Sequence, residues 1–392
     1  MGSSLTYLLY PLLLLILAAL VYQVLALVSL ARLFSARPGP PLPEPPPGVT
    51  VLKPVKGLEP DSRACLESFL TQDYPAYEVL FGVADQGDAV LPLLDDLVRA
   101  HPQRPARVVL CTEVLGQNPK VSILRQLEPL ARHDLLVVAD GDVKVGEDFL
   151  QRVAAGLAEP GVGLVSCLYR AGPARTLGSA LEALTISADF IPSVAVARQV
   201  EGIRFALGAA LALPRQVLAR LGGFAAIADH LADDYQLGWQ VHRLGLRVDL
   251  LPYVVETVNP HMTLAAYFLH QLRWSRTYRV CRPGGYLAFG VTHGLVFALV
   301  LWLASGLAGW ALELTGAVLA LRAAVALASE RLYLRGRLRP GAFLLLPVKD
   351  LLAFALWLLS FSGDTVTWRG RRFRLRRDGA LMETQKEDSG RK

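Results

Sequence analysis

Two aspartates lie two residues apart at the end of a short apolar run, in the sequence Asp140-Gly141-Asp142. The run before them, residues 135–139, reads Leu-Leu-Val-Val-Ala and is typical of a buried strand. A hard divalent cation such as Mg²⁺ or Mn²⁺ takes oxygen ligands and often shares one or two carboxylates with substrate phosphates. A plain turn would use the same residues. The position after a strand favours a metal clamp, because ligands bind outside the carboxyl ends of strands in open sheets.

A second acidic pair, Asp233-Asp234, precedes an amphipathic stretch at residues 236–241. One of these acids could cap the amino end of a helix. Confined neighbouring carboxylates also raise each other's pKa, so one of them could take a proton from an acceptor hydroxyl as a general base. The two interpretations are compatible, because adjacent residues can divide the roles.

A third group, His270, Arg273 and Trp274, lies in a stretch expected to be helical from about residue 264. The guanidinium could neutralise a diphosphate leaving group, with the indole as an apolar wall. Residues three apart share a helix face, so His270 and Arg273 would point toward the same group. The alternative is an anchor at a membrane interface, in which His270 only packs.

Short β-rich runs alternate with helical stretches before these motifs. We expect strands at residues 49–52, 78–83, 107–111, 135–139, 163–168 and 247–251. This alternation predicts an α/β fold with a mostly parallel sheet and right-handed crossovers. Asp85 follows the second strand, so it should lie near Asp140 and Asp142 at the binding edge. The chain has no GxGxxG after the first strand and no GxxxxGK[ST] loop, which argues against dinucleotide and P-loop nucleotide binding.

The amino-terminal region is predicted to be a membrane anchor. Residues 5–31 carry no charge and are long enough to cross a bilayer as one helix. A cleaved signal would have a shorter apolar core and a small-residue cleavage site. Arg32 and Arg37 follow, and by the positive-inside rule they place the next domain in the cytoplasm.

Two further apolar regions lie in the last third of the chain. Residues 287–321 predict a helical hairpin broken near residues 306–309. Residues 342–361 are a third candidate, but Lys349 and Asp350 lie inside it, and charges at that depth are costly unless paired or near an interface. We therefore expect this last segment to be crossing, interfacial or re-entrant.

The composition agrees with a membrane protein. The 392 residues are 53% hydrophobic and carry a net charge of +6. Much of the arginine adjoins apolar segments, where anionic lipid headgroups account for it better than nucleic acid does. The four cysteines show no CxxC spacing and no Cys/His cluster, so neither a zinc site nor a disulfide framework is indicated.

Together these motifs resemble the ceramide glucosyltransferase-like inverting glycosyltransferases (glycosyltransferase family 2/21 type), a group related to cellulose and chitin synthases. The likeness spans nearly the whole chain. It is carried by the sequences VLKPVKG (51–57), QDYP (72–75) and NPK (118–120), and by the family's D, D, D, (Q/R)xxRW signature, which falls on Asp85, Asp140, Asp234 and His270-xx-Arg273-Trp274. His270 stands where Gln or Arg is usual. Residues 162–170, 231–235 and 270–276 resemble the bacterial hopanoid branch, in which a histidine at that position is not foreign.

The resemblance implies a nucleotide-diphospho-sugar transferase domain (GT-A, Rossmann-like) plus transmembrane helices. It implies inverting transfer of glucose or N-acetylglucosamine from a UDP-sugar donor to a lipid hydroxyl of ceramide or a hopanoid polyol. Asp234 would be the catalytic base, and Asp140 with Asp142 would hold Mg²⁺ or Mn²⁺. Donor binding would fall to Asp85, Lys120, Asp140, His270, Arg273 and Trp274. A bacterial inner membrane is the expected location.

The expected organisation combines both arguments. It comprises an amino-terminal transmembrane anchor (1–33), a Pro-rich linker (34–47), a cytoplasmic GT-A domain (48–260), an interfacial segment with the HxxRW motif (261–286), carboxyl-terminal membrane helices (287–363) and a basic tail (364–392).

Two other functions share these features. A processive polysaccharide synthase carries the same signature, but it needs a longer transmembrane pore than three candidate segments after the domain provide. A catalytically inactive nucleotide-sugar-binding membrane protein would keep Asp85 and lose the base or the clamp. Release of UDP that depends on a lipid acceptor distinguishes an enzyme from a binder.

Overall fold

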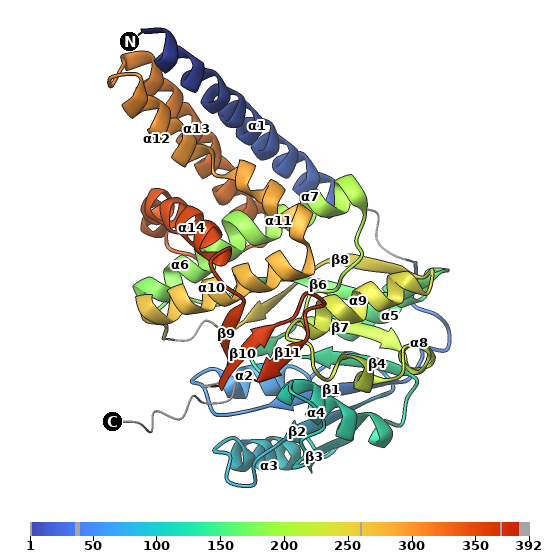
Figure 1. The fold of residues 1–392 in the computed structure, drawn as a ribbon. Coiled ribbons are helices and arrows are strands. Elements are labelled where there is room, and N and C mark those ends of the chain that lie inside the picture. Colours follow the sequence, from blue (N-terminus) through green and yellow to red (C-terminus); the bar gives the residue numbers. More distant parts are fainter. Residues whose placement is uncertain (1, 36–39, 259–260, 369–370, 384–392) are drawn as a thin grey trace, which may run out of the picture.

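The computed structural model describes residues 2–35, 40–258, 261–368 and 371–383. Parts of the expected linker and tail, including Arg37, lie outside the described residues. Figure 1 shows a sheet domain with flanking helices, a group of long helices above it, and a small second sheet near the carboxyl end.

The main sheet has eight strands in the order β3-β2-β1-β4-β7-β6-β8-β5. The strands are β1 (Val49–Val55), β2 (Tyr77–Val83), β3 (Ala106–Leu110), β4 (Leu135–Ala139), β5 (Val143–Lys144), β6 (Val162–Ala171), β7 (Ala210–Pro214) and β8 (Arg247–Thr257). Within this sheet β7 and β5 run against the other strands. The expected α/β class is confirmed, and the two reversed strands, which the sequence pattern did not predict, make the sheet mixed.

Helices cover both faces of this sheet. They are α2 (Ser62–Glu67), α3 (Leu91–Ala100), α4 (Pro119–Leu127), α5 (Phe149–Leu157), α8 (Arg215–Arg220) and α9 (Asp233–Arg243), with short 3-10 turns η1 (Glu128–Leu130) and η3 (Phe224–Ile227). Along β1, Val49 and Val51 enter one hydrophobic cluster and Leu52 enters another. Alternate residues of a strand point to opposite faces, so the sheet has a core on each side. Leu30 and Leu33, at the end of the first helix, join the former cluster.

Apolar helices occupy all of the predicted membrane regions. They are α1 (Gly2–Phe34), α11 (Pro283–Phe289), η4 (Gly290–Thr292), α12 (Gly294–Ala304), α13 (Gly309–Ala328), η5 (Ser329–Tyr333), η6 (Pro340–Leu345) and α14 (Leu346–Ser360). Four helical stretches in the described residues are long and apolar enough to cross a membrane, and a bent pair at residues 283–304 could form a fifth. The predicted hairpin break is confirmed, since α12 ends at Ala304 and α13 begins at Gly309.

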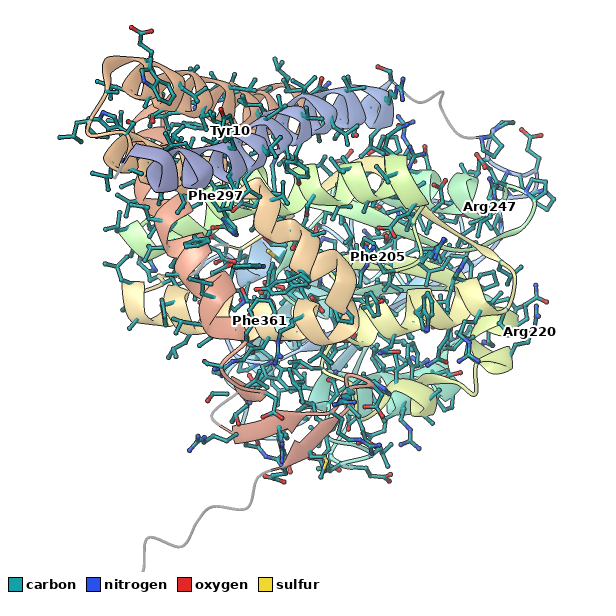
Figure 2. All side chains as sticks on the ribbon, turned by 45° about the horizontal axis from the view of Figure 1, so that its top comes forward. Tyr10, Phe205, Arg220, Arg247, Phe297 and Phe361 are labelled. Atoms are coloured by element: carbon teal, nitrogen blue, oxygen red, sulfur yellow. The ribbon has the colours of Figure 1, made fainter. Side chains whose placement is uncertain are left out.

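The additional apolar stretch is Leu177–Glu201, which the sequence analysis included in the GT-A domain. It is built from α6 (Leu177–Thr185), the π-helical turn η2 (Ile186–Phe190) and α7 (Ile191–Glu201). Within its most apolar window, 61% is buried in the protein. Figure 1 shows it between the sheet and the long helices, so it forms a layer that joins them. Figure 2 shows Tyr10 and Phe297 among the long helices, and Arg220 and Arg247 at the far end of the sheet domain.

The carboxyl-terminal region differs from the expected basic tail. It folds into a small antiparallel sheet of β9 (Thr365–Trp368), β10 (Arg371–Leu375) and β11 (Leu381–Glu383). Its arginines suggested a basic tail, but Phe373 and Leu375 alternate with them in β10 and form a buried cluster with Val366 and Leu381. A local alternation of this kind is typical of a half-buried strand.

The charges inside the third apolar region are paired. Lys349 and Asp350 of α14 are buried, and Asp350 Oδ1 lies 2.8 Å from Lys349 Nζ and 3.1 Å from Arg322 Nη2 of α13. Asp189 of η2 forms ion pairs with both Arg322 and Lys349. Two acids therefore balance two bases, which meets the condition under which buried charges are tolerated. The cluster ties α13 and α14 to the layer below.

Replacing Arg322 with Met should destabilise the protein strongly. The change leaves Asp189 and Asp350 to share Lys349, and breaking a buried pair costs about 3–5 kcal/mol. The free energy of unfolding in detergent measures this. The control is Arg63→Met, which breaks the exposed Arg63–Asp96 pair and should leave the stability close to that of the wild type, because water screens exposed ion pairs. Equal losses in the two variants would contradict a stabilising role for the buried cluster.

Candidate active site

Lys120 joins the two acidic motifs at the carboxyl edge of the sheet. Its Nζ lies 2.7 Å from Asp140 Oδ1, after β4, and 3.1 Å from Asp233 Oδ2, at the start of α9. Burial alone would lower the pKa of Lys120, but Asp140, Asp233 and Asp234 outweigh it and raise the pKa above its usual range. The ammonium is therefore permanently charged and holds the two motifs together.

Asn118 explains why Lys120 lies there. This fully buried residue caps α4, and its Oδ1 accepts hydrogen bonds from the backbone N–H groups of Lys120 and Val121 at 3.0 and 3.3 Å. Its Nδ2 donates to His230 O at 2.8 Å and to Asp233 Oδ1 at 3.5 Å. One amide thus fixes the start of α4 and the approach to α9. The NPK motif contained this residue, but its spacing alone did not indicate the role.

Asp234 occupies the first turn of α9, and its Oδ1 accepts a hydrogen bond from Tyr235 N–H at 2.8 Å. Burial raises the pKa of Asp234 to about 7; Asp233 raises it further, while Lys120 opposes the shift. The capping interpretation is wrong for both acids, because the N-cap residue is Ala232 and no side chain caps the helix. Their carboxylates are instead engaged with Lys120 and Tyr235.

A glycine that the sequence analysis missed lies directly against this carboxylate. A Cβ atom built on Gly208 would come within 2.8 Å of Asp234 Oδ2. Any side chain at residue 208 would therefore displace the Asp234 carboxylate. No sequence signal identified Gly208, because the contact joins the loop before β7 to α9.

A buried lysine shapes the turn that carries Asp140 and Asp142. Lys53 Nζ donates to Asp140 O at 2.7 Å and to Val143 O at 3.2 Å. Burial lowers the pKa of Lys53 to about 8. This residue was also missed, since a lysine inside a strand pattern usually indicates an exposed edge. Asp142 is open to solvent, yet the surrounding protein raises its pKa to about 6 by partial desolvation, and Asp140 adds to the shift.

Asp85 lies apart from this group. It is exposed in the loop after β2, and its Oδ1 accepts a hydrogen bond from Gly87 N–H at 2.9 Å. Lys120 contacts Asp140 and Asp233 directly, while Asp85 follows β2, which is separated from β4 by β1 in the parallel part of the sheet.

The HxxRW motif lies on α10 (Leu264–Cys281), which Thr263 caps. His270 Nδ1 lies 3.3 Å from Glu182 Oε1 of α6, and the His270 and Trp274 rings are 5.0 Å apart. Gln271 Nε2 donates to the same buried carboxylate at 2.8 Å. His270 therefore has the surroundings expected of the packing alternative. Trp274 also contacts Phe190 of η2, at 5.7 Å between ring centroids. Arg273 projects from the same helix, and Tyr278 lies within electrostatic reach of both Arg273 and Asp234.

No group of three or more His, Cys, Asp or Glu side chains in the described residues is arranged to hold a metal ion. Asp140 and Asp142 are the acidic pair that the sequence analysis assigned to a cation. A cation there would depend on oxygen ligands from substrate and water as well.

Comparisons with known proteins agree with this geometry. The family model described as glycosyl transferase family 21 matches residues 11–381. A ceramide glucosyltransferase of Komagataella phaffii is 32% identical over 150 residues, which are 36% of this chain and 30% of that protein. Ceramide glucosyltransferase 1 of Caenorhabditis elegans is 22% identical over 229 residues, 58% of this chain and 49% of that protein. The matches thus span about half of these relatives' length or less.

Among solved structures, a mannosyltransferase from Pyrobaculum calidifontis in complex with GDP-Man and Mn²⁺ has a TM-score of 0.55 at 22% identity. The alignment covers 92% of this chain and 96% of that chain, so the likeness shows a shared fold over most of both and confirms the expected GT-A class. With the family model matched from the first apolar helix to β11, the chain belongs to glycosyl transferase family 21.

Proposed function

We propose that this protein transfers a sugar, glucose or N-acetylglucosamine, from a UDP-sugar to the hydroxyl of a membrane lipid, either ceramide or a hopanoid polyol. The observation that carries the proposal is the Asp234 carboxylate. Burial raises its pKa to about 7, and the adjacent Asp233 lies 3.1 Å from Lys120, which also contacts Asp140 at the edge of the sheet where ligands bind. A carboxylate with that pKa can take a proton near neutral pH.

In the proposed step, Asp234 accepts the proton of the lipid hydroxyl while the hydroxyl oxygen attacks the anomeric carbon. The attack comes from the face opposite the diphosphate, whose bond to that carbon breaks, so UDP leaves and an α-linked donor gives a β-glycoside. Lys120 and Arg273 would offset the charge that develops on the leaving group. Asp85 would hold the nucleoside portion, and Trp274 would form an apolar wall.

Asp140 and Asp142 fit a Mg²⁺ or Mn²⁺ ion, since such ions commonly take one or two protein carboxylates together with substrate phosphates and water. Asp140 is partly exposed even while it is paired with Lys120, and Asp142 is open to solvent, so both carboxylates are accessible. When bound, the cation would supply charge stabilisation for the departing diphosphate.

The long helices support a membrane-bound acceptor. They lie beside the sheet domain (Figure 1), and α1 ends in that domain's core, where Leu30 and Leu33 are buried, which supports an active edge close to a bilayer. We infer a multi-pass protein of a bacterial inner membrane, as the family resemblance implies, with a cytoplasmic sheet domain, because Arg32 lies in the last turn of α1 on the side of that domain. A hollow of about 210 Å³ beside Tyr235, lined also by Phe205, Trp239 and Arg282, could receive the polar part of the lipid. Figure 2 shows Phe205 near the centre of the molecule.

The two alternatives gain less support. A polysaccharide synthase would need a pore, and the relatives reported above are described as ceramide glucosyltransferases. A nucleotide-sugar-binding protein without activity would lack the base or the acidic pair, and this chain retains both.

Replacing Asp234 with Asn should reduce turnover by about 10² to 10⁴ while donor binding persists, because the amide keeps the size but cannot accept a proton. In the wild type, kcat/KM should fall about tenfold for each pH unit below about 7, since only the ionised form is a base. Acceptor-dependent UDP release measures both. Asp249→Asn is the control, because Asp249 also accepts from the following N–H group but lies on β8. If Asp234→Asn keeps more than about a tenth of the activity, the base assignment fails and Asp233 becomes the next candidate.

Replacing Asp140 and Asp142 together with Asn should weaken metal-dependent donor binding, because amides are poorer ligands for hard cations. Chelation of the wild type should have the same effect, and adding Mg²⁺ or Mn²⁺ should reverse it. Titration of UDP binding with and without EDTA provides the measurement. Full activity in excess EDTA would refute the metal assignment but not the transferase activity.

His270→Ala should lower turnover and cost about 1 kcal/mol of stability, because it removes the ring between Glu182 and Trp274. His270→Gln should stay close to the wild type, since it retains a donor for Glu182 and restores the usual family residue. Thermal unfolding and UDP release test both, with the exposed Leu269→Ala on the same helix as control. Equal, near wild-type activity of both variants would leave His270 a packing role alone.

A further inference from the structure

The carboxyl-terminal sheet, β9 to β11, contacts the segment that carries Asp233 and Asp234. Leu381 N–H donates to Asp229 O at 2.7 Å, and Ala380 forms an antiparallel bridge with His230. Gln236 Nε2, in the first turns of α9, donates to Asp378 O at 3.1 Å. β11 and the turn before it thus contact residues 229–236 through their own backbone atoms.

Apolar packing strengthens this contact. Leu231, from the loop before α9, is buried in the same hydrophobic cluster as Val366, Phe373 and Leu381 of the small sheet. A three-stranded sheet of this size has little core of its own, so it needs such partners for stability. The order of the loop and the order of the sheet therefore depend on each other.

The small sheet also contacts α10, the helix that carries Arg273 and Trp274. Val280 packs on the same cluster, and Arg279 Nη2 donates to Gly363 O at 2.8 Å. Arg276 donates to Thr365 O in the first strand of the sheet. Tyr235 OH then donates to Cys281 O at 2.9 Å, which closes the connection between α9 and α10.

We propose that this sheet is a positioning clamp that sets the Asp234 carboxylate relative to the HxxRW helix. The catalytic part of the inference rests on the proposed function. The start of α9 has no side-chain cap, so its position depends on contacts from outside the helix. Lys120 and Asn118 contact this segment from the main sheet domain. The carboxyl-terminal strands β9 to β11 contact it from the small sheet.

Gly379 gives a specific way to loosen the clamp. Its φ is +85°, a conformation that side chains rarely adopt, and a Cβ there would come within 3.3 Å of Gln236 Nε2. Gly379→Val should therefore distort the turn and displace Gln236. Gln236→Ala removes the hydrogen bond to Asp378 O without changing any residue of the small sheet. Arg374→Ala is the matched control, because it breaks a pair with Asp364 on the exposed face of the same sheet.

The first measurement is hydrogen exchange of residues 229–236 in the full-length protein, which reports local opening. Protection should fall in Gly379→Val and Gln236→Ala and stay at the wild-type level in Arg374→Ala. Unchanged protection in the first two variants would overturn the clamp, whether or not the protein transfers sugar.

The second measurement separates kcat from the KM of the UDP-sugar. A displacement of about 1 Å can cost about 100-fold in rate, so kcat should fall about 10- to 100-fold in the two clamp variants. The donor KM should change by less than about twofold, because the lost interaction matters in the transition state. A lowered melting temperature with wild-type kcat would overturn the positioning role. Absence of acceptor-dependent UDP release in the wild type would instead refute the proposed function, and hydrogen exchange would still decide the clamp.

Discussion

The site depends on one ammonium group placed among four carboxylates. Asp140, Asp142, Asp233 and Asp234 come from two motifs far apart in the chain, and Lys120 contacts one acid of each pair. Without a shared cation, these like charges would repel one another at the sheet edge. The raised pKa values of Asp142 and Asp234 show that desolvation and repulsion still act on the two acids that Lys120 does not contact. Four carboxylates exceed the charge of one ammonium, and the divalent cation proposed above would offset the remainder.

A buried cluster of two acids and two bases connects the apolar helices to the helix that carries the HxxRW motif. Asp189 pairs with Arg322 and Lys349, and the next residue, Phe190, packs against Trp274 of the HxxRW motif. Both residues lie in the π-helical turn η2, so the same turn pairs with the charges of the apolar helices and packs against the HxxRW motif. Such turns often occur at functional positions. The apolar layer is therefore structurally continuous with the HxxRW motif, as the proposed transfer to a membrane lipid requires.

Membership of glycosyl transferase family 21 and the GT-A fold define the general chemistry. In the proposed function, the choice of lipid and sugar would depend on surfaces that the family signature does not include. The hollow beside Tyr235 is the surface of this chain where such selectivity would arise, because Tyr235 directly follows Asp234 and donates its N–H to the Asp234 carboxylate.

The sequence by itself determined the features that local pattern encodes. Strand-end position predicted that Asp140 and Asp142 follow a buried strand, which is β4, and the length of apolar runs predicted the first apolar helix and the broken hairpin. The spatial partners were decided by the tertiary structure alone: Lys53 under the Asp140 turn, Gly208 against Asp234, and β11 against the loop before α9. These contacts join residues distant in the chain, so no local periodicity carries them. The expected basic tail is likewise a sheet in the structure. Its arginines dominate the local sequence, and the apolar residues between them form a core only when the strands pack together.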